Sequence, residues 1–580
     1  MLYHKSSMDR QHCKTAGIFQ ALSLSEVESH MNANPPDAKR LKFFCDILFV
    51  LSLAAVVIFI LRLPLFPNSD GSVHLYYAHV MWSLVNHQPL YEHFYAIRHL
   101  IGVYSIHYFA LILFENFVSP AKAEELFIAI ILVNSALGFR FLAGRLGANS
   151  AVVSLWMVPL LLSWPLGAGF LNYCFAIGAV CWALGFWIGL PPEGKARGVI
   201  GFSVAVVAMI FSHPVPLLFL VIFLTADLLL RWMEERRSNA SGFFRRHSAR
   251  LAAFGLTCLA ILVPSILVQK GQIVSDLRDI YPHPHLLRYL LEGRYVGMFG
   301  GGYPLQILYT IGVLFVIPGV ALLMAKGPWT RLRQGKTTAA DRLLVFSILF
   351  LVATLSFPDS LNGADNFPQR FWILLWMMIL ACGAAATVKA RALGWIAAGG
   401  GLLIVITGTV AMRTMPGVAR MQAVVSHVRL PSGSKGIFLE PWGRSPYDFG
   451  LTGNVFYSVG FRAAAQSDAI ILNSPWIYQE HMPIRENGRS GLIADYVSWY
   501  SSQPPRLLKI VSTPSPTRDA VLRASDFFLL ADPWKMNGGL VNSVRLILRD
   551  EQPQWSCKYG KDYVMCQRVR KREQAGSSLR

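Results

Sequence analysis

Residues 43–62 read FFCDILFVLSLAAVVIFILR, and residues 63–79, LPLFPNSDGSVHLYYAH, follow directly. The first stretch is apolar and, at ~1.5 Å rise per residue, long enough to cross a ~30 Å hydrocarbon layer as a helix. The second stretch is polar and aromatic, which is typical of a loop outside the membrane. Similar apolar runs recur as far as residue 412, so the sequence predicts a multi-pass helical membrane protein.

The composition agrees with this prediction. The chain has 580 residues, of which 54% are hydrophobic and only 15% are charged, and its mean hydropathy is +0.42. Such a composition excludes a single soluble domain. We expect about 11 to 13 transmembrane helices, with twelve candidate spans near 43–62, 101–118, 125–143, 149–163, 171–190, 199–212, 214–231, 250–268, 305–325, 342–357, 369–388 and 392–412.

The basic residues indicate the topology. The net charge of +20 comes largely from short loops between spans, at 231–250, 326–342 and around Lys389, which the positive-inside rule assigns to the cytoplasm. The charge therefore implies no nucleic-acid partner. The expected domains are a cytoplasmic tail over 1–42, a transmembrane domain over 43–412 with outer loops at 63–100 and 269–304, and an extracytoplasmic soluble domain over 413–580.

Counting spans forwards from a cytoplasmic N-terminus places the loop 231–250 outside the cytoplasm. Its basic charge places the same loop inside. One segment therefore does not cross the membrane. We expect this to be 101–118, because it carries His107 and Glu115 and is suited to a re-entrant or interfacial helix beside the first loop.

The C-terminal domain has short apolar runs broken by Pro, Gly, Asn and Asp, which predict a small mixed α/β fold. Cys557 and Cys566 lie there and are the candidate disulfide pair. The basic loops fit a bacterial inner membrane, with this domain in the periplasm, where a disulfide persists.

Asp70 is the candidate general base, because a carboxylate at the mouth of a helix, next to His74, can have its pKa tuned by partial burial. The alternative is that Asp70 only caps the helix that begins near Val73. Arg370, at the same predicted membrane face, is either a snorkelling anchor or a clamp for a phosphate.

The sequence indicates no cofactor clearly. A site for a divalent cation is a weaker candidate. His283 and His285 could hold such an ion together with Asp276 or Asp279, although two histidines at this spacing in a loop are more often solvated.

The layout resembles the GT-C glycosyltransferases, such as the protein O-mannosyltransferases and the lipid A aminoarabinose transferases. The matching features are Asp70 in the first outer loop, Pro89-Leu90-Tyr91 further on, the run RFLAGRLG at 140–147, and a many-span body followed by a soluble domain.

The resemblance implies transfer of a sugar from a polyprenyl phosphate or diphosphate to a glycan, lipid or protein outside the cytoplasm. Asp70 would deprotonate the acceptor hydroxyl, which attacks the anomeric carbon with inversion, while Arg370 and His213 stabilise the departing phosphate. The other candidates for substrate binding are His74, Arg98 and Tyr173. Two alternatives from other classes are a secondary transporter or flippase and a non-catalytic envelope assembly protein.

Overall fold

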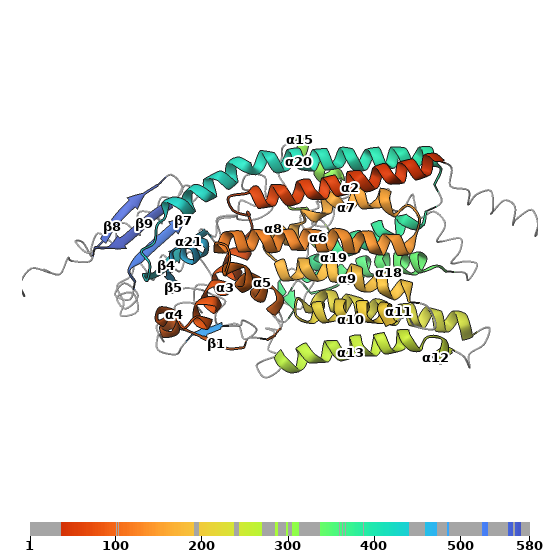
Figure 1. Ribbon diagram of the computed structural model, residues 1–580, viewed down its shortest axis with the longest axis horizontal. Helices are drawn as coiled ribbons and strands as arrows, with labels where there is room; N and C mark the ends of the chain where they lie inside the picture. The colour runs from red at the N-terminus through yellow and green to blue at the C-terminus, as the bar shows by residue number, and fades with distance from the viewer. Residues whose placement is uncertain are drawn as a thin grey trace, which may run out of the picture.

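The apolar runs form a bundle of helices that lie roughly along the long axis of the molecule (Figure 1). The computed structural model describes residues 36–99, 101–102, 104–190, 196–236, 243–268, 285–287, 297–299, 304–312, 319, 337–358, 360–361, 364–365, 367–386, 388–439, 459–472, 484–486, 525–531, 555–560 and 563–569.

Within these residues, six helices are long and apolar enough to cross a membrane, judged by length and composition. They are α2 (Pro36–Arg62), α6 (Pro120–Leu146), α9 (Leu171–Gly189), α11 (Pro214–Arg236), α19 (Phe367–Cys382) with the 3-10 turn Gly383–Ala385, and α20 (Ala390–His427). The remaining helices of the bundle are α7 (Ser150–Leu161), α8 (Trp164–Ala168), α10 (Ala196–Ile210), α12 (Phe243–Arg246), α13 (Ser248–Val268), α15 (Pro304–Ile311) and α18 (Ala339–Thr354). The multi-pass helical prediction is confirmed.

The first helix begins earlier than the sequence indicated. We expected the span to start at residue 43, but α2 starts at Pro36 and takes in part of the predicted tail. Proline is favoured in the first helical turn, because the backbone N–H groups there have no acceptor within the helix and the N–H that proline lacks is not missed. Residues 1–35 of the predicted tail lie outside the described residues.

Helices α6 and α9 cross closely because small residues meet at their contact. A Cβ at Gly138 of α6 would lie 2.8 Å from the carbonyl oxygen of Gly178 on α9. Asn134 of α6 strengthens the contact by donating from Nδ2 to the carbonyl oxygen of Phe175 at 2.9 Å. This pair of helices forms the rigid base on which the site residues of α9 are carried.

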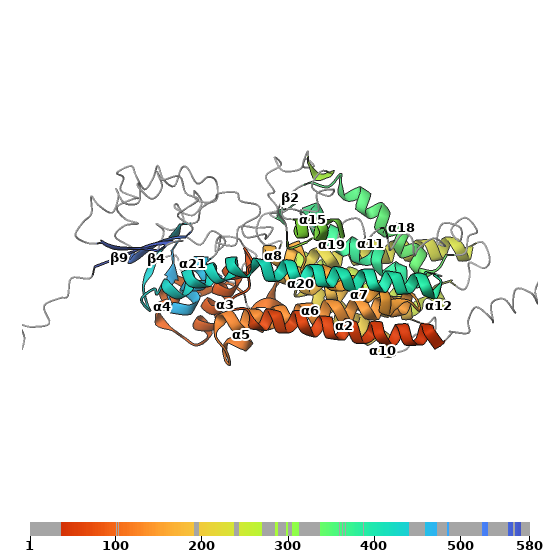
Figure 2. The ribbon, with the colours of Figure 1, turned by 90° about the horizontal axis from the view of Figure 1, so that it is seen from above.

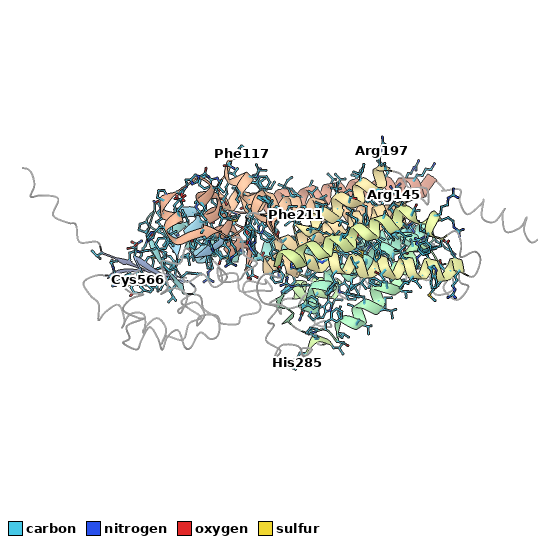
Figure 3. The ribbon with its side chains drawn as sticks, turned by 90° about the horizontal axis from the view of Figure 1, so that it is seen from below. Phe117, Arg145, Arg197, Phe211, His285 and Cys566 are labelled. Atoms are coloured by element: carbon cyan, nitrogen blue, oxygen red, sulfur yellow. A yellow bond between two sulfur atoms is a disulfide. The ribbon has the colours of Figure 1, made fainter. Side chains whose placement is uncertain are left out.

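The end of the bundle that carries the basic residues is held by a buried ion cluster. The Asp227 carboxylate lies 2.7 Å from Arg231 Nε and 2.6 Å from Arg342 Nε, and it accepts a hydrogen bond from Trp187 at 2.9 Å. Arg145 and Arg197 lie towards the same end, far from Cys566 at the other (Figure 3).

The opposite end holds the short elements that follow α2 and the C-terminal sheet. Helices α3 (Gly71–Val85), α4 (Pro89–Phe94) and α5 (Ser105–Glu115) and strand β1 (Tyr95–Ile97) gather there beside α21 (Val459–Ser467). Strand β1 pairs antiparallel with β6 (Ile484–Glu486), so the first loop and the C-terminal domain share a sheet. A separate small pair is formed by β2 (Ser360–Leu361) and β3 (Ala364–Asp365).

The five-stranded sheet has the order β5-β4-β7-β9-β8, formed by β4 (Lys435–Leu439), β5 (Ile470–Ile471), β7 (Phe527–Ala531), β8 (Trp555–Tyr559) and β9 (Tyr563–Arg568). Strands β5, β4 and β7 pair in parallel, and β9 pairs antiparallel with both β7 and β8, so the sheet is mixed. Cys557 and Cys566 lie directly opposite each other on β8 and β9 and form a disulfide.

Helix α20 connects the bundle to this sheet without a break at residue 412, the expected domain boundary. It continues to His427, with Pro416 inside it, and runs from the bundle towards the sheet (Figure 2). The segment 101–118 forms α5, whose 11 residues rise only about 17 Å. This helix is too short to cross a ~30 Å hydrocarbon layer.

Candidate active site

The loop that carries Asp70 lies against the end of α8. The backbone N–H groups of Ser69 and Asp70 donate to the carbonyl oxygens of Gly167 and Ala168, at 3.2 and 3.0 Å. These two bonds fix the entry to α3, so the position of Asp70 is set by a segment distant in sequence.

The approach requires a glycine after α8. Gly169 has φ +86°, in the left-handed region that only glycine adopts without strain. A Cβ there would lie 2.2 Å from the backbone nitrogen of Gly71 and 2.8 Å from that of Asp70. Gly169 therefore allows contact between the two backbones that any larger residue would prevent.

Asp70 occupies the N-cap position of α3, but its side chain makes no capping hydrogen bond. Asp70 therefore has the N-cap position that the alternative interpretation predicts, but not the capping hydrogen bond from its side chain. The side chain is half-buried, and the N-terminal end of the helix dipole favours its negative charge. The ionised form is the one that can accept a proton, so this position is compatible with the role of a base.

Arg370 lies in the first turn of α19 and is only 8% exposed. Its guanidinium stands over the ring of Phe170, 4.2 Å from the ring centroid, and Nη1 lies 3.1 Å from His213 Nε2. A snorkelling arginine would extend to the surface. The guanidinium of Arg370 is instead buried inside the protein, which argues against the snorkelling interpretation.

His213 accepts the hydrogen bond from Arg370, because a guanidinium has only donors. The backbone N–H of Val215 also points at this ring, 3.2 Å from Nδ1. A neutral imidazole has one acceptor nitrogen, which can serve one of these two donors at a time, whereas a protonated ring has none. His213 is therefore suited to orient Arg370 and not to add a second positive charge.

Two tyrosines pack against the His213 ring, with centroids 5.3 Å away in each case: Tyr104 and Tyr173. Tyr104 has φ +75°, an uncommon conformation for an aromatic residue. Such strain persists only where the surroundings impose it, and it is frequent at functional sites. The hydroxyl of Tyr173 is buried and has no hydrogen-bond partner among the described residues.

A second polar group lies around His74, one turn into α3. Its Nδ1 is hydrogen-bonded to the Tyr108 hydroxyl at 2.7 Å, and its ring meets that of His107 at 5.4 Å. His107 Nδ1 lies 3.4 Å from Asn172 Nδ2. Asn172 adjoins Tyr173 on α9, so this group and the one around Arg370 are neighbours. In the described part of the chain, His107 Nε2 and Asn172 Oδ1 have no partner.

The short segment Ala168–Phe170 brings the two charged candidates together. Asp70 is bonded to Ala168 through its backbone, and Arg370 stands over Phe170. The backbone of Asp70 and the guanidinium of Arg370 thus contact positions two residues apart on one turn. His213 contacts both Arg370 and Tyr173, and His74 is linked through His107 to Asn172, the neighbour of Tyr173.

The other predicted residues lie elsewhere. Arg98 directly follows β1, is half-buried and is positioned beside the β1–β6 pair. Of the candidate cation ligands, Asp276, Asp279 and His283 fall outside the described residues, and His285 is exposed at the surface (Figure 3). No group of three or more His, Cys, Asp or Glu side chains suited to a metal occurs among the residues described.

Sequence reasoning missed the aromatic partners of this site. Neither Phe170 nor Tyr104 stands in a sequence pattern that indicates a role. Gly169 carried the available signal, because a glycine just after a short apolar segment suggests a turn or a close backbone approach.

No protein-family description matches the chain, and no curated protein matches it. Solved structures are similar to it at low identity. The arabinofuranosyltransferase AftD from mycobacteria has a TM-score of 0.47 and 13% identity, with 91% of this chain and 40% of that chain covered. ArnT from Cupriavidus metallidurans, bound to undecaprenyl phosphate, has a TM-score of 0.45 and 13% identity, with 90% and 98% covered.

This chain thus spans less than half the length of AftD. Structural similarity to GT-C glycosyltransferases, which the sequence led us to expect, is found at a distant level.

Proposed function

We propose that this chain is a membrane glycosyltransferase that moves a sugar from a polyprenyl-phosphate donor to a hydroxyl group of a glycan, lipid or protein acceptor. The observation that carries the proposal is that the backbone of Asp70 and the guanidinium of Arg370 both contact the short segment Ala168–Phe170. Such a transfer needs a base for the acceptor proton and a cation for the leaving phosphate, and these two side chains supply them.

The proposed reaction has one displacement. Asp70 takes the proton of the acceptor hydroxyl as that oxygen attacks the anomeric carbon from the face opposite the phosphate. The bond from this carbon to the phosphate oxygen breaks, and the oxygen leaves with the electron pair. Arg370 donates hydrogen bonds to the phosphate, whose charge grows in the transition state. The configuration at the anomeric carbon inverts.

The aromatic and neutral surroundings strengthen the proposed clamp. Phe170 and His213 exclude water from two sides of the Arg370 guanidinium, and charge interactions are stronger where water is excluded. Polar atoms of Tyr173, Asn172 and His107 that have no partner among the described residues are candidates for hydrogen bonds to the sugar, since a buried polar atom without a partner is costly.

We propose that the N-terminus is cytoplasmic and that the sheet end is periplasmic, in a bacterial inner membrane. Arg145 and Arg197 at one end of the molecule and the disulfide at the other support this orientation (Figure 3). Basic residues favour the cytoplasmic side, and disulfides persist in oxidising compartments.

A donor-consumption assay tests the function. Wild type and Asp70→Asn are compared in nanodiscs with a panel of polyprenyl-phosphate sugars, and free polyprenyl phosphate is measured. The matched control is Asp46→Asn, which removes a carboxylate of α2 that pairs with Arg140 at 2.7 Å and has no place in the proposed site.

We expect release by wild type and by the control, and a loss of about 10²-fold or more in Asp70→Asn, as for removal of a general base. Equal rates in all three proteins would remove Asp70 as the base. A folded wild type that releases nothing from any donor would favour the transporter or assembly alternatives instead.

A further inference from the structure

Arg462 is a fully buried arginine of the C-terminal domain that reaches into the transmembrane domain. It lies on α21, is 0% exposed and forms an ion pair with Glu124 of α6, which is also 0% exposed, at 2.6 Å between Nη2 and Oε2. Glu124 in turn accepts a hydrogen bond from Asn68 Nδ2 at 2.9 Å. Burying two full charges is expensive, so this contact is a costly way merely to attach a domain.

The other contacts of Arg462 fall on both sides of Asp70. Nη2 donates to the carbonyl oxygen of Phe66 at 2.8 Å and lies 3.5 Å from Asn68 Oδ1, before Asp70 in the chain. Nε donates to the Ser72 hydroxyl at 2.6 Å, after Asp70. One planar guanidinium therefore bridges the two arms of the loop.

This bridge complements the contact with α8. The backbone bonds from Ser69 and Asp70 hold the middle of the loop from one element, and Arg462 holds its two arms from another. Gly71 completes the fit, since a Cβ there would lie 2.4 Å from Asn68 Nδ2. The loop is thus fixed between α8 and the C-terminal domain.

We propose that Arg462 is a positioning residue that keeps Asp70 in its working geometry, so that the C-terminal domain controls the rate of a reaction whose chemical groups lie elsewhere. This inference rests on the proposed function and adds a role for the soluble domain. A general base must lie within hydrogen-bond reach of its proton, and a displacement of about 1 Å can cost about 10²-fold in rate.

The variant Arg462→Lys tests the bridge. A lysine keeps the positive charge near Glu124, but its single ammonium cannot span Phe66 and Ser72 as a fork does. Ser72→Ala is the milder second variant, because it removes one hydrogen bond and keeps the buried ion pair. Asp468→Asn is the matched control: Asp468 joins the same domain to α3 through His79 at 2.9 Å and lies outside the contacts of the loop.

Two measurements are made on the full chain in nanodiscs: hydrogen exchange of residues 66–74, and kcat and KM for the donor. In Arg462→Lys we expect exchange to be faster by about fivefold or more and kcat to fall by about 10 to 100-fold with KM nearly unchanged. Ser72→Ala should change both in the same direction by less, and Asp468→Asn should change neither.

Unchanged exchange at residues 66–74 in both test variants would overturn the proposal, and so would faster exchange with an unchanged kcat. A fall in kcat accompanied by an equal fall in the folded fraction, or shared by Asp468→Asn, would reduce Arg462 to a docking residue. If wild type releases no polyprenyl phosphate from any donor, the proposed function fails, while the exchange measurement still decides whether Arg462 orders the loop.

Discussion

The backbone N–H of Asp70 donates to the carbonyl oxygen of Ala168 at 3.0 Å, and this bond forms only because the next residue after Ala168 lacks a side chain. Through it, the loop after the first span and the turn before α9 form one unit. Arg370 contacts the same unit, because its guanidinium lies over the ring of Phe170.

Gly169→Ala should disturb this unit. The substitution places a Cβ against the backbone of Gly71 and puts alanine at φ +86°, so we expect Asp70 to move and donor turnover to fall by about 10²-fold. Turnover is compared with that of Gly408→Ala, where nothing lies within 4 Å of the new Cβ. The control should be as active as wild type and slightly more stable, because alanine favours the helix. Wild-type turnover in Gly169→Ala would mean that the close contact is unimportant.

Arg370→Lys should weaken phosphate binding although it keeps the charge. Lysine cannot donate a fork of hydrogen bonds and loses the planar contact with Phe170. We expect the affinity for free polyprenyl phosphate, measured by its inhibition of turnover, to fall by about 10-fold, and by about 100-fold in Arg370→Gln. Equal inhibition of all three proteins would place the phosphate elsewhere.

The link between His79 and Asp468 should weaken at high pH. Burial lowers the pKa of His79, but hydrogen bonds to Asp468 and Glu115 outweigh it and raise the pKa from 6.5 to about 9. Stability from this charge is therefore complete below pH 6.5 and is lost as the pH rises through about 9. Tyr91 and Trp82 also face the ring, and neither is an acid at neutral pH. The hydrogen bond from His79 holds the pKa of Asp468 below 3.8, so acid removes the link only below that value.

We expect the Tm difference between wild type and His79→Gln to be largest near pH 6 and to shrink above pH 9. The control is His87→Gln, which alters an exposed histidine at the end of the same helix, paired with exposed Glu92. That variant should follow wild type at every pH. A Tm difference that is independent of pH would mean that His79 contributes packing and not charge.

Reduction of the Cys557–Cys566 disulfide should destabilise the C-terminal sheet. The bridge closes a short loop between β8 and β9, for which chain entropy gives a contribution of about 2 to 3 kcal/mol. The measurement is thermal unfolding with and without reductant, compared with Cys557→Ser/Cys566→Ser. Alkylation of intact cells before lysis should leave both thiols unlabelled. Rapid labelling would indicate a reducing compartment and reverse the proposed orientation.

Much of the fold could be predicted from residues alone, because membrane spans follow from local apolar length. The expected spans near 125–143, 171–190 and 214–231 correspond to α6, α9 and α11. The ends of the spans were less predictable. Helix α20 continues to His427, because a less apolar sequence past residue 412 can extend a helix that packs against the C-terminal domain. A small mixed α/β fold was expected at the C-terminal end, but the order and directions of its strands depend on pairings between distant segments.

The site was predictable in its residue types and not in its contacts. Asp70 and Arg370 stood out because the predicted topology places both at the same membrane face. Phe170, Tyr104 and Arg462 did not, since aromatic residues and arginines are frequent in such a chain. Their roles appear only where Phe170 lies under a guanidinium and Arg462 spans a loop from another domain.

By itself the sequence determined that the chain is a helical membrane protein with a polar loop after the first span and a small domain at its end, because hydrophobic length acts over about 20 residues at a time. The tertiary structure alone decided which polar groups meet. The contacts of Asp70 with Ala168, Arg370 with His213, and Arg462 with Glu124 join residues far apart in the chain. Such contacts depend on how the helices pack, which no local pattern of residues encodes.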